Sequence, residues 1–559
     1  MTSVPETTAV PMPEARPRLR DLLAAATAAP GPDPSPTAPV VVAELVPWAG
    51  ALDDPAGDRT RKLASELEGD PRIAALSITD NAGGHARLSP EILARELVER
   101  GRRVIVHVTC RDRNRSELLS LGWRLHSAGI EDLLLLSGDY TSSGYLGVAK
   151  PVFDIDSTAL LALYDRLNRG IGGTVVARPI ARDTDRAIEA LGPARNAGAP
   201  DRTDFHLGAA VNPYKVIEAD QVPQFLKLEA KVRAGARYAI TQAGWDMRKA
   251  GELVRWVADR SVPVTLMASV MVLTRTTARI VNGGEVPGVL IPPALMEAVE
   301  REAGAPDKGK AFFADLAARQ IAILRGQGYA GIYLGGPTRA EDFLRILERA
   351  AEYGKSDWRA LVAGTTFGAP RTWYAYGRAA GGSGLSGSAP TPLRHNGDGL
   401  RTRAWYGFNR AVHGLVFDTE KAPLAPAARS FFAGLERAHL GGAFHVLEQA
   451  VKIPMYDCRD CGDCSLPDIA YLCPESQCVK NQRNGPCGGS NAGECEIAGK
   501  RCIWTRAYGR LAPYRETLAM LERDAVVCDN ALRRTSAWSN TFLGRDHATR
   551  PPINPADGK

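Results

Sequence analysis

The chain has 559 residues, 45% of them apolar and 24% charged, which is ordinary for a water-soluble protein of two or three domains. Its formal net charge of +6 is spread thinly and no basic stripe carries interleaved aromatic residues, so we expect no nucleic-acid partner. No apolar stretch approaches the roughly 20 residues of a membrane span. The first residues also lack the pattern of a secretory signal. We therefore expect a cytoplasmic protein that does not contact a membrane.

Residues 1–39 are rich in proline and alanine and predict a flexible tail with one helix at 18–28. From Val40 onward, short apolar and β-branched runs alternate with longer amphipathic segments. Helices are expected among these segments at 90–100, 117–128 and 340–353. The strand candidates are 40–45, 74–79, 104–109, 132–136, 206–211, 237–241, 262–267 and 331–334.

Eight strands that alternate with helices predict a (β/α)8 TIM-type barrel over residues 40–354. An open, doubly wound parallel sheet is the alternative. It is disfavoured because no G-x-G-x-x-G pattern opens the helix after the first strand.

The pattern becomes irregular after the barrel. Residues 355–450 include a Gly/Ser linker at 380–390 and predict a connecting or capping segment. A small cysteine-rich, metal-binding domain is expected at 451–512. Residues 513–559 predict a C-terminal helix at 513–534 and then a polar tail.

Polar residues stand at the ends of the predicted strands, where a barrel carries its chemistry. The residues are Glu44, Thr79, Asp80, His107, Gly138, Asp139, Asn212 and Gln242. We expect these positions to converge on one cavity, where carboxylates, an imidazole and amides form an acid–base site. Each of them is also readable as a loop cap or, for His107, as a core histidine. Lys231 lies in the middle of a predicted helix, and its sequence position alone favours a solvated helix charge.

Eight of the ten cysteines fall within 45 residues: Cys458, Cys461, Cys464, Cys473, Cys478, Cys487, Cys495 and Cys502. Disulfides do not persist in the cytoplasm, so such a cluster indicates metal ligands, and eight thiols fill two four-thiolate sites. The C-x2-C-x2-C spacing at the start, with Pro474 after the fourth cysteine, is typical of a [4Fe-4S] cluster. Four thiolates hold zinc equally well, so one or two clusters or zinc alone remain open. Cys110 and Cys528 are expected to be ordinary thiols.

Several sequence strings between residues 40 and 350 resemble the methylenetetrahydrofolate reductase family. They include VAELVP, LSITDNAGG, LLLLSGD, LGAAVNP and KVRAGARYAITQ. The tract CRDCGDC…NGPCGGS…RCIW resembles a cysteine-rich C-terminal domain found in some members and in partner subunits of acetogenic reductases. The resemblance implies a flavin-bearing barrel whose reduced flavin passes hydride to 5,10-methylenetetrahydrofolate, giving 5-methyltetrahydrofolate.

The resemblance also assigns roles to particular residues. Glu44 matches the general acid, Asp139 the carboxylate beside flavin and pterin, and Gln242 the amide that reads the pterin edge. The flavin-contacting positions are Thr79, His107, Asp139, Ala210, Asn212 and Lys231.

Four positions depart from the better-known FAD-binding members. Ser137 replaces an arginine, Asn212 a tyrosine, Gln224 an aspartate and Asp80 a tyrosine. These changes leave open whether the flavin is FAD or FMN. They also leave open whether NAD(P)H or a protein electron carrier is the direct reductant.

The leading prediction is a flavoenzyme that interconverts methylene- and methyl-tetrahydrofolate, with the cysteine-rich domain passing electrons to or from the flavin. The physiological direction is open, because the site would be the same. A folate-dependent methyltransferase is one alternative. A flavin-free electron-transfer or scaffold subunit is another, and assembly as a homo-oligomer or with a partner subunit stays open.

Overall fold

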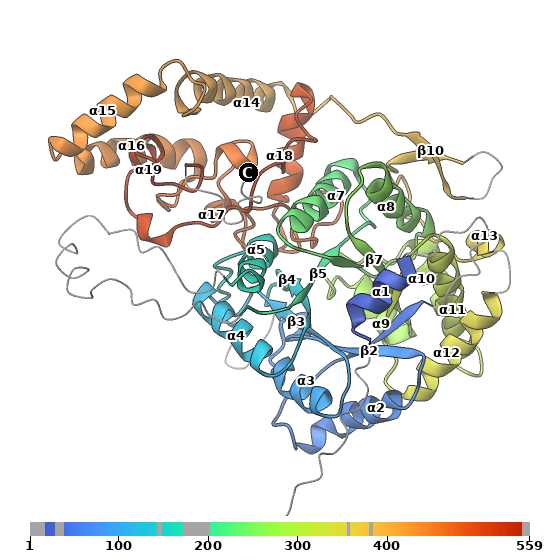
Figure 1. Ribbon diagram of the computed structural model, residues 1–559. Helices are drawn as coiled ribbons and strands as arrows, with labels where there is room; N and C mark the ends of the chain where they lie inside the picture. The colour runs from blue at the N-terminus through green and yellow to red at the C-terminus, as the bar shows by residue number, and fades with distance from the viewer. Residues whose placement is uncertain are drawn as a thin grey trace, which may run out of the picture.

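The computed structural model describes residues 17–27, 39–141, 148–170, 202–354, 358–379 and 384–549. Eight parallel strands close into a barrel in chain order, with helices on the outside (Figure 1). The predicted fold is therefore confirmed. The strands are β1 Val40–Leu45, β2 Ile73–Ile78, β3 Val104–Thr109, β4 Asp132–Leu136, β5 His206–Val211, β6 Tyr238–Thr241, β7 Thr265–Met271 and β8 Gly331–Gly335.

Most strands lie where the apolar runs predict them, because parallel strands covered on both faces are apolar on both faces. Strand β7 is the exception, since it begins at Thr265 and not at the expected position 262. Pro263 lies inside the expected run and has no N–H to donate to a neighbouring strand, which explains the later start.

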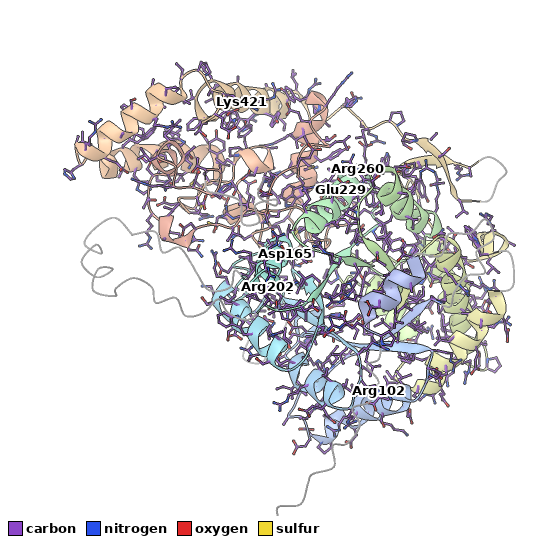
Figure 2. The ribbon with its side chains drawn as sticks, viewed as in Figure 1. Arg102, Asp165, Arg202, Glu229, Arg260 and Lys421 are labelled. Carbon is purple, nitrogen blue, oxygen red and sulfur yellow. The ribbon has the colours of Figure 1, made fainter. Side chains whose placement is uncertain are left out.

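The helices around the barrel begin at polar caps in several cases. The side chains of Asn114, Asp156 and Asp246 accept backbone N–H groups at the starts of α4, α5 and α8. On the surface, Glu229 of α7 pairs with Arg260 at the end of α8 (Figure 2). The helices are α2 Asp58–Glu68, α3 Pro90–Glu99, α4 Arg115–Ser127, α5 Ser157–Asn168, α7 Glu218–Arg233, α8 Met247–Asp259, α9 Arg275–Asn282, α10 Pro293–Glu302, α11 Lys310–Gly326, α12 Ala340–Tyr353 and α13 Trp358–Leu361.

Helix α1, Leu19–Thr27, packs against the end of the barrel where the strands begin. Leu19 and Leu23 join the apolar cluster inside the barrel. Arg20 donates to Asp204 just before β5. This part of the expected tail is therefore packed, and it covers the barrel end opposite the strand ends that carry the predicted site.

Residues 400–456 are mostly helical, so the prediction of an irregular segment is wrong for this part of the chain. They form α14 Leu400–Val412, α15 Ala425–Arg437 and α16 Gly441–Tyr456, after a two-stranded sheet of β9 Tyr376–Arg378 and β10 Ser386–Pro390. Helix α16 also runs past the expected boundary at 450. These helices expose large apolar residues such as Leu400, Phe431 and Val446.

The cysteine-rich domain consists mostly of loops, with α17 Pro474–Gln477, α18 Ile503–Leu511 and α19 Ala537–Phe542. Helix α18 packs on α7 of the barrel (Figure 1), where Trp504 and Tyr508 share a buried cluster with Val222. Across this interface, Tyr508 Oη donates to Glu218 Oε1 at 2.6 Å. The two domains are therefore joined by both apolar and polar contacts.

The predicted helix at 513–534 is wrong. The structure has only short 3-10 turns there, at Ala512–Tyr514 and Asn530–Leu532. Met520, Leu521 and Val526 are buried although the segment that carries them is not helical. Tertiary packing therefore overrides the local helical pattern. Among the described residues, no helix is both long and apolar enough to cross a membrane.

Candidate functional site

A cavity of about 470 Å³ lies at the ends of the barrel strands. Its wall includes all eight barrel residues to which the resemblance assigns a role: Glu44, Thr79, His107, Asp139, Ala210, Asn212, Lys231 and Gln242. The cysteine-rich domain supplies another part of the wall, with Lys480, Pro486, Cys487, Gly488, Gly489 and Glu496. The structure thus brings the sequence-predicted residues together and adds a second domain that the strand pattern could not indicate.

Glu44 projects from β1 into the cavity, beside β8. The Tyr333 hydroxyl of β8 donates to Glu44 Oε2 at 2.8 Å. Burial raises the pKa of Glu44, and the Tyr333 hydrogen bond offsets only part of that shift. Gly335 makes room for the carboxyl group, because a Cβ there would lie 3.0 Å from Glu44 Oε1. The site therefore favours a protonated Glu44 more than water does.

His107 lies beside this pair. Its Nε2 atom is 3.0 Å from Ser77 Oγ and 3.4 Å from the Tyr333 hydroxyl. Burial lowers the pKa of His107 to about 4, so the imidazole is neutral near pH 7. Sequence reasoning missed Tyr333 and Ser77. The period-two alternation of β8 could have indicated that Tyr333 points inward.

Asp139 follows a turn that requires glycine. Gly138 has a φ of +86°, and a Cβ there would lie 3.1 Å from Arg111 Cβ. Lys480 of the cysteine-rich domain donates to Gly138 O at 2.8 Å and pairs with Glu496 at 2.6 Å. The loop that presents Asp139 is therefore held in part by the second domain.

Other strand-end residues make contacts within the protein. Asp80 accepts hydrogen bonds from Thr109 and pairs with Arg113 at 2.6 Å, so it fastens two loops. The amide of Asn212 donates to Gly288 O at 2.8 Å and accepts from Tyr214 N at 2.9 Å. Both residues fit the loop-cap reading, although they line the cavity.

Three buried polar atoms on the cavity wall have no hydrogen-bond partner among the described residues: Thr79 Oγ1, Gln224 Nε2 and Glu496 Oε2. Buried polar groups are nearly always satisfied, so these atoms point to a bound polar molecule. Lys231 is also buried, contrary to the solvated charge that its position in the sequence favours, and its Nζ donates to Ala210 O at 2.7 Å. Burial lowers the pKa of Lys231 to about 7. Donors and acceptors around a partly apolar cavity fit a flavin ring system.

The structure separates the eight clustered cysteines into two sets. The first set, Cys458, Cys461, Cys464 and Cys473, surrounds a small cavity beside α16. The second set is Cys478, Cys487, Cys495 and Cys502. Burial raises the pKa of Cys478, Cys495 and Cys502, and the nearby Cys487 raises each of these pKa values further. Within the described residues, no three His, Cys, Asp or Glu side chains are arranged to hold a metal ion.

The chemistry of both sets nevertheless fits thiolate ligands. Cys458 Sγ accepts from Asp460 N at 3.4 Å, and Cys487 Sγ accepts from Gly489 N at 3.4 Å. Lys452 Nζ lies 3.8 Å from Cys464 Sγ. N–H donors and cations favour the thiolate form that iron–sulfur clusters and zinc require.

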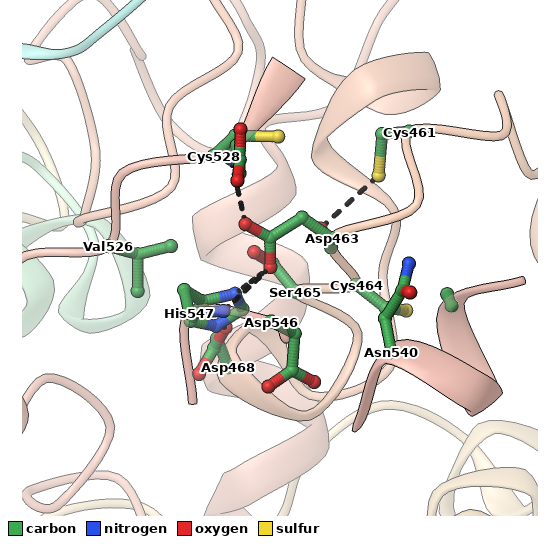
Figure 3. A network of polar contacts seen from close by, with 12 residues as sticks. Cys461, Asp463, Cys464, Ser465, Asp468, Val526, Cys528, Asn540, Asp546 and His547 are labelled. Atoms are coloured by element: carbon green, nitrogen blue, oxygen red, sulfur yellow. Dashed lines mark hydrogen bonds and ion pairs between the residues drawn. The ribbon is translucent and has the colours of Figure 1, made fainter. Parts of the chain in front are cut away.

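Cys528 lies beside the first set, although the sequence predicts an ordinary thiol. A hydrogen bond with Cys528 lowers the pKa of Cys461 by more than burial raises it. The loop between Cys461 and Cys464 is tied to the C-terminal segment (Figure 3), because Asp463 accepts from Asp529 N at 2.8 Å and from His547 N at 3.0 Å. The loop that carries Cys461 and Cys464 is therefore packed against the segments around Asp529 and His547.

The fold and the cavity at its strand ends define a TIM-barrel enzyme with a cysteine-rich domain over its site. Residues 201–351 match the family model described as methylenetetrahydrofolate reductase, and residues 438–529 match the one described as methylene-tetrahydrofolate reductase C terminal. The resemblance seen in the sequence is confirmed: two regions of the chain match models of the methylenetetrahydrofolate reductase family, in the predicted order. These matches support a folate-linked, reductase-like enzyme.

No curated protein matches the chain. Among solved structures, one similar chain is an uncharacterized protein from Clostridium thermocellum that binds two copies of 5-methyl-5,6,7,8-tetrahydrofolic acid. It shows 13% identity over 57% of this chain and 96% of that one, with a TM-score of 0.38. Tryptophan synthase from M. tuberculosis shows 13% identity over 59% of this chain and 94% of that one, with a TM-score of 0.28. Neither likeness bears on the function.

Proposed function

We propose that the protein is a flavin-dependent oxidoreductase that interconverts 5,10-methylenetetrahydrofolate and 5-methyltetrahydrofolate by hydride transfer. One observation supports this most strongly. In a chain with a methylenetetrahydrofolate reductase domain, Glu44, Asp139 and Gln242 share one cavity with the flavin-contacting positions. The unsatisfied Thr79 Oγ1 atom adds a buried polar group that a bound cofactor would satisfy.

The two carboxylates take different roles because their surroundings differ. Burial raises the pKa of Glu44, which suits it to carry the proton for the folate nitrogen that leaves when the five-membered ring opens. Ring opening creates an iminium cation on the folate. Asp139 is half-buried on the cavity wall, and its side chain would stabilise this cation as it forms. Gln242 orients the pterin edge, and the flavin, when bound, supplies or accepts the hydride.

Thr79, His107, Ala210, Asn212 and Lys231 would hold the flavin, either FAD or FMN. The eight clustered cysteines would hold one or two iron–sulfur clusters or zinc. Cys487 stands on the cavity wall, which supports a role for the cysteine-rich domain in passing electrons to or from the site. The electrons would be exchanged with NAD(P)H or a protein carrier in the cytoplasm, where thiols stay reduced.

The test is an anaerobic visible spectrum of the purified, flavin-reconstituted protein, recorded before and after addition of 5-methyltetrahydrofolate. We expect flavin bands that bleach on addition of the folate. The Glu44→Gln variant should keep the flavin bands and lose the bleaching. A folded wild-type protein that binds no flavin, or whose flavin ignores the folate, would overturn the proposal.

A further inference from the structure

The two oxygen atoms of the Glu44 carboxyl group have different surroundings. Oε2 accepts a hydrogen bond from the Tyr333 hydroxyl at 2.8 Å. Oε1 accepts none within the described part of the chain, and it lies beside Gly335, where a Cβ would be only 3.0 Å away. Since Glu44 lines the cavity, Oε1 is the oxygen that is left for a bound molecule.

The barrel fixes the position of Tyr333 before any molecule binds. In the ladder between β1 and β8, Tyr333 pairs with Val42, two residues before Glu44, so the Tyr333 and Glu44 side chains project from the same side of the sheet. Tyr333 is only 5% exposed, and it belongs to the apolar cluster inside the barrel with Ile240 and Met267. Close packing around a buried ring leaves it little freedom, so the hydroxyl is held in place.

The surroundings of Tyr333 keep its hydroxyl protonated. Burial and the neighbouring Glu44 raise the pKa of Tyr333 well above its ordinary value. The hydroxyl also lies 3.4 Å from His107 Nε2, and Ser77 Oγ lies 3.0 Å from the same nitrogen. Because burial lowers the pKa of His107 to about 4, the imidazole is neutral near pH 7 and adds no charge beside Glu44. Tyr333 is therefore a neutral, permanent donor.

Charged groups elsewhere on the cavity wall do not take over this role. Among the described residues, burial raises the pKa of Glu44 and the Tyr333 hydrogen bond lowers it, and these are the two influences on it. The wall also carries Asp80, Arg111, Asp139, Lys231 and Lys480, but none of these shifts the pKa of Glu44. One hydroxyl group is thus the polar contact that opposes burial at Glu44.

This contact has two chemical consequences. A protonated carboxyl group has one hydroxyl oxygen that donates and one oxygen that accepts, so a donor at Oε2 places the proton on Oε1. After the proton has left, the same hydrogen bond stabilises the carboxylate that remains. Glu44 is therefore a stronger acid than burial alone would make it, and its proton faces the cavity.

We propose that Tyr333 is a positioning residue that orients the Glu44 carboxyl group and sets its strength as an acid, by holding Oε2 and leaving Oε1 to deliver the proton. The inference deepens the proposed function, because it rests on Glu44 as the acid. The proton moves from Oε1 to the folate nitrogen while the ring C–N bond breaks and leaves its electron pair on that nitrogen. The negative charge left on Glu44 spreads to Oε2, where Tyr333 donates.

The experiment follows the infrared band of the protonated Glu44 carboxyl group in the full-length protein as the pH is changed. The band is identified as the one that Glu44→Gln removes. We expect Tyr333→Phe to move its titration to higher pH by about one unit or more, because a hydrogen bond to a charged group is lost. The matched control is Tyr238→Phe, at another buried barrel tyrosine whose hydroxyl donates to Leu133 O at 3.0 Å. It should titrate like the wild type.

The pH dependence of folate turnover gives a second readout. In Tyr333→Phe, the falling limb should move to higher pH together with the infrared titration, and the plateau rate should fall about tenfold, because the acid is weaker and less well oriented. In the Glu44→Gln background, Tyr333→Phe should cause no further loss, since it acts through Glu44. A change in KM alone, with an unmoved limb, would mean that Tyr333 has only a structural role and would overturn the inference.

An unchanged infrared titration in folded Tyr333→Phe would also overturn it, and so would an equal shift in Tyr238→Phe. Circular dichroism checks folding. If Tyr333→Phe does not fold, 3-fluorotyrosine at position 333 keeps the shape of the ring and is a stronger donor. The titration should then move to lower pH, and no movement would count against the inference. The infrared titration needs neither flavin nor folate, so the expected shift without folate turnover would refute only the proposed function.

Discussion

The two thiol sets differ in how the charge around them is balanced. Near the first set, each cation pairs with a carboxylate of the C-terminal region. Lys452 pairs with Glu448 at 3.0 Å, and Arg483 pairs with Glu475 at 2.8 Å. Near the second set, Lys480 pairs with Glu496. Within the described residues, Lys215 and Lys227 of the barrel hydrogen-bond instead to oxygen atoms of the cysteine-rich loop. The first environment is complete within its own region, and the second needs the barrel.

This difference indicates that the two thiol sets have different roles. A site whose charges are balanced locally can form without the barrel, which suits a folding or outer electron-transfer role. A site that shares buried charges with the barrel and contributes Cys487 to the cavity wall is coupled to the reaction site. We therefore expect changes at the second set, and not at the first, to alter the cavity.

The largest expected effect separates the cavity chemistry from both thiol sets. Replacing Glu44 by glutamine keeps the Tyr333 contact but removes the acid, so folate turnover should fall by roughly 100- to 10,000-fold. The metal content of both sets should not change. Steady-state turnover and metal analysis of the same preparation measure both effects. Turnover at the wild-type rate would exclude Glu44 as the acid.

The pH profile gives a second readout of the same residue. Burial raises the pKa of Glu44, and folate reduction needs the protonated form. The rate should therefore fall as the pH rises through this raised pKa, and the falling limb should vanish in the residual activity of Glu44→Gln.

Replacing Asp139 by asparagine should slow hydride transfer by a factor on the order of 100, because it removes the fixed charge that stabilises the cation. Flavin binding should be retained, since the shape of the side chain is kept. Rapid-mixing, single-turnover measurements of flavin absorbance test this. Asp307→Asn, at an exposed carboxylate outside the cavity, is the matched control. An unchanged single-turnover rate would remove Asp139 from this step.

The barrel was predictable because its signals are local. The first six strands are short apolar runs that end in polar groups, so cavity residues such as Glu44, Asp139 and Gln242 could be found without tertiary information. Ala210 and Lys231 were indicated only by the resemblance. The cavity wall from the second domain could not. Lys480 meets Gly138 across more than 300 positions of the chain, and no local pattern reports such a contact.

Two further predictions failed for related reasons. The segment 513–534 has a helical pattern, but Met520 and Leu521 are buried by packing beside α18 and not by a helix. Lys231 reads as a solvated charge in sequence, yet its ammonium group lies on the cavity wall and donates to Ala210 O of β5. Burial by a distant segment cannot be read from the periodicity of one helix.

A smaller effect compares the two sets directly. Cys487→Ser and Cys461→Ser should each lower the metal content about twofold. Only Cys487→Ser should also shift the absorbance of bound flavin, because only Cys487 lines the cavity. Metal analysis and a flavin difference spectrum of the two variants test this. Equal flavin shifts in both variants would contradict the inference that only the second thiol set borders the cavity.

The smallest expected effect concerns the first thiol set and depends on pH. His547 Nδ1 lies 2.5 Å from Asp463 and Nε2 lies 2.9 Å from Asp468 (Figure 3). Burial lowers the pKa of His547, but the two carboxylates outweigh it and raise the pKa to about 10. Because the folded pKa lies above the unfolded value of about 6.5, the stabilisation is complete below pH 6.5 and is lost as the pH rises through about 10.

Replacing His547 by glutamine should therefore lower the unfolding temperature of the cysteine-rich domain by a few degrees at pH 6 and by much less at pH 10. Thermal unfolding at both pH values, followed by circular dichroism, measures the difference. The second set and the flavin spectrum should not respond, since among the described residues the His547 side chain hydrogen-bonds to Asp463 and Asp468, both between Cys461 and Cys473. A loss of stability that is equal at both pH values would mean that His547 stabilises the domain by packing. Its charge would then not contribute to the charge balance around the first thiol set.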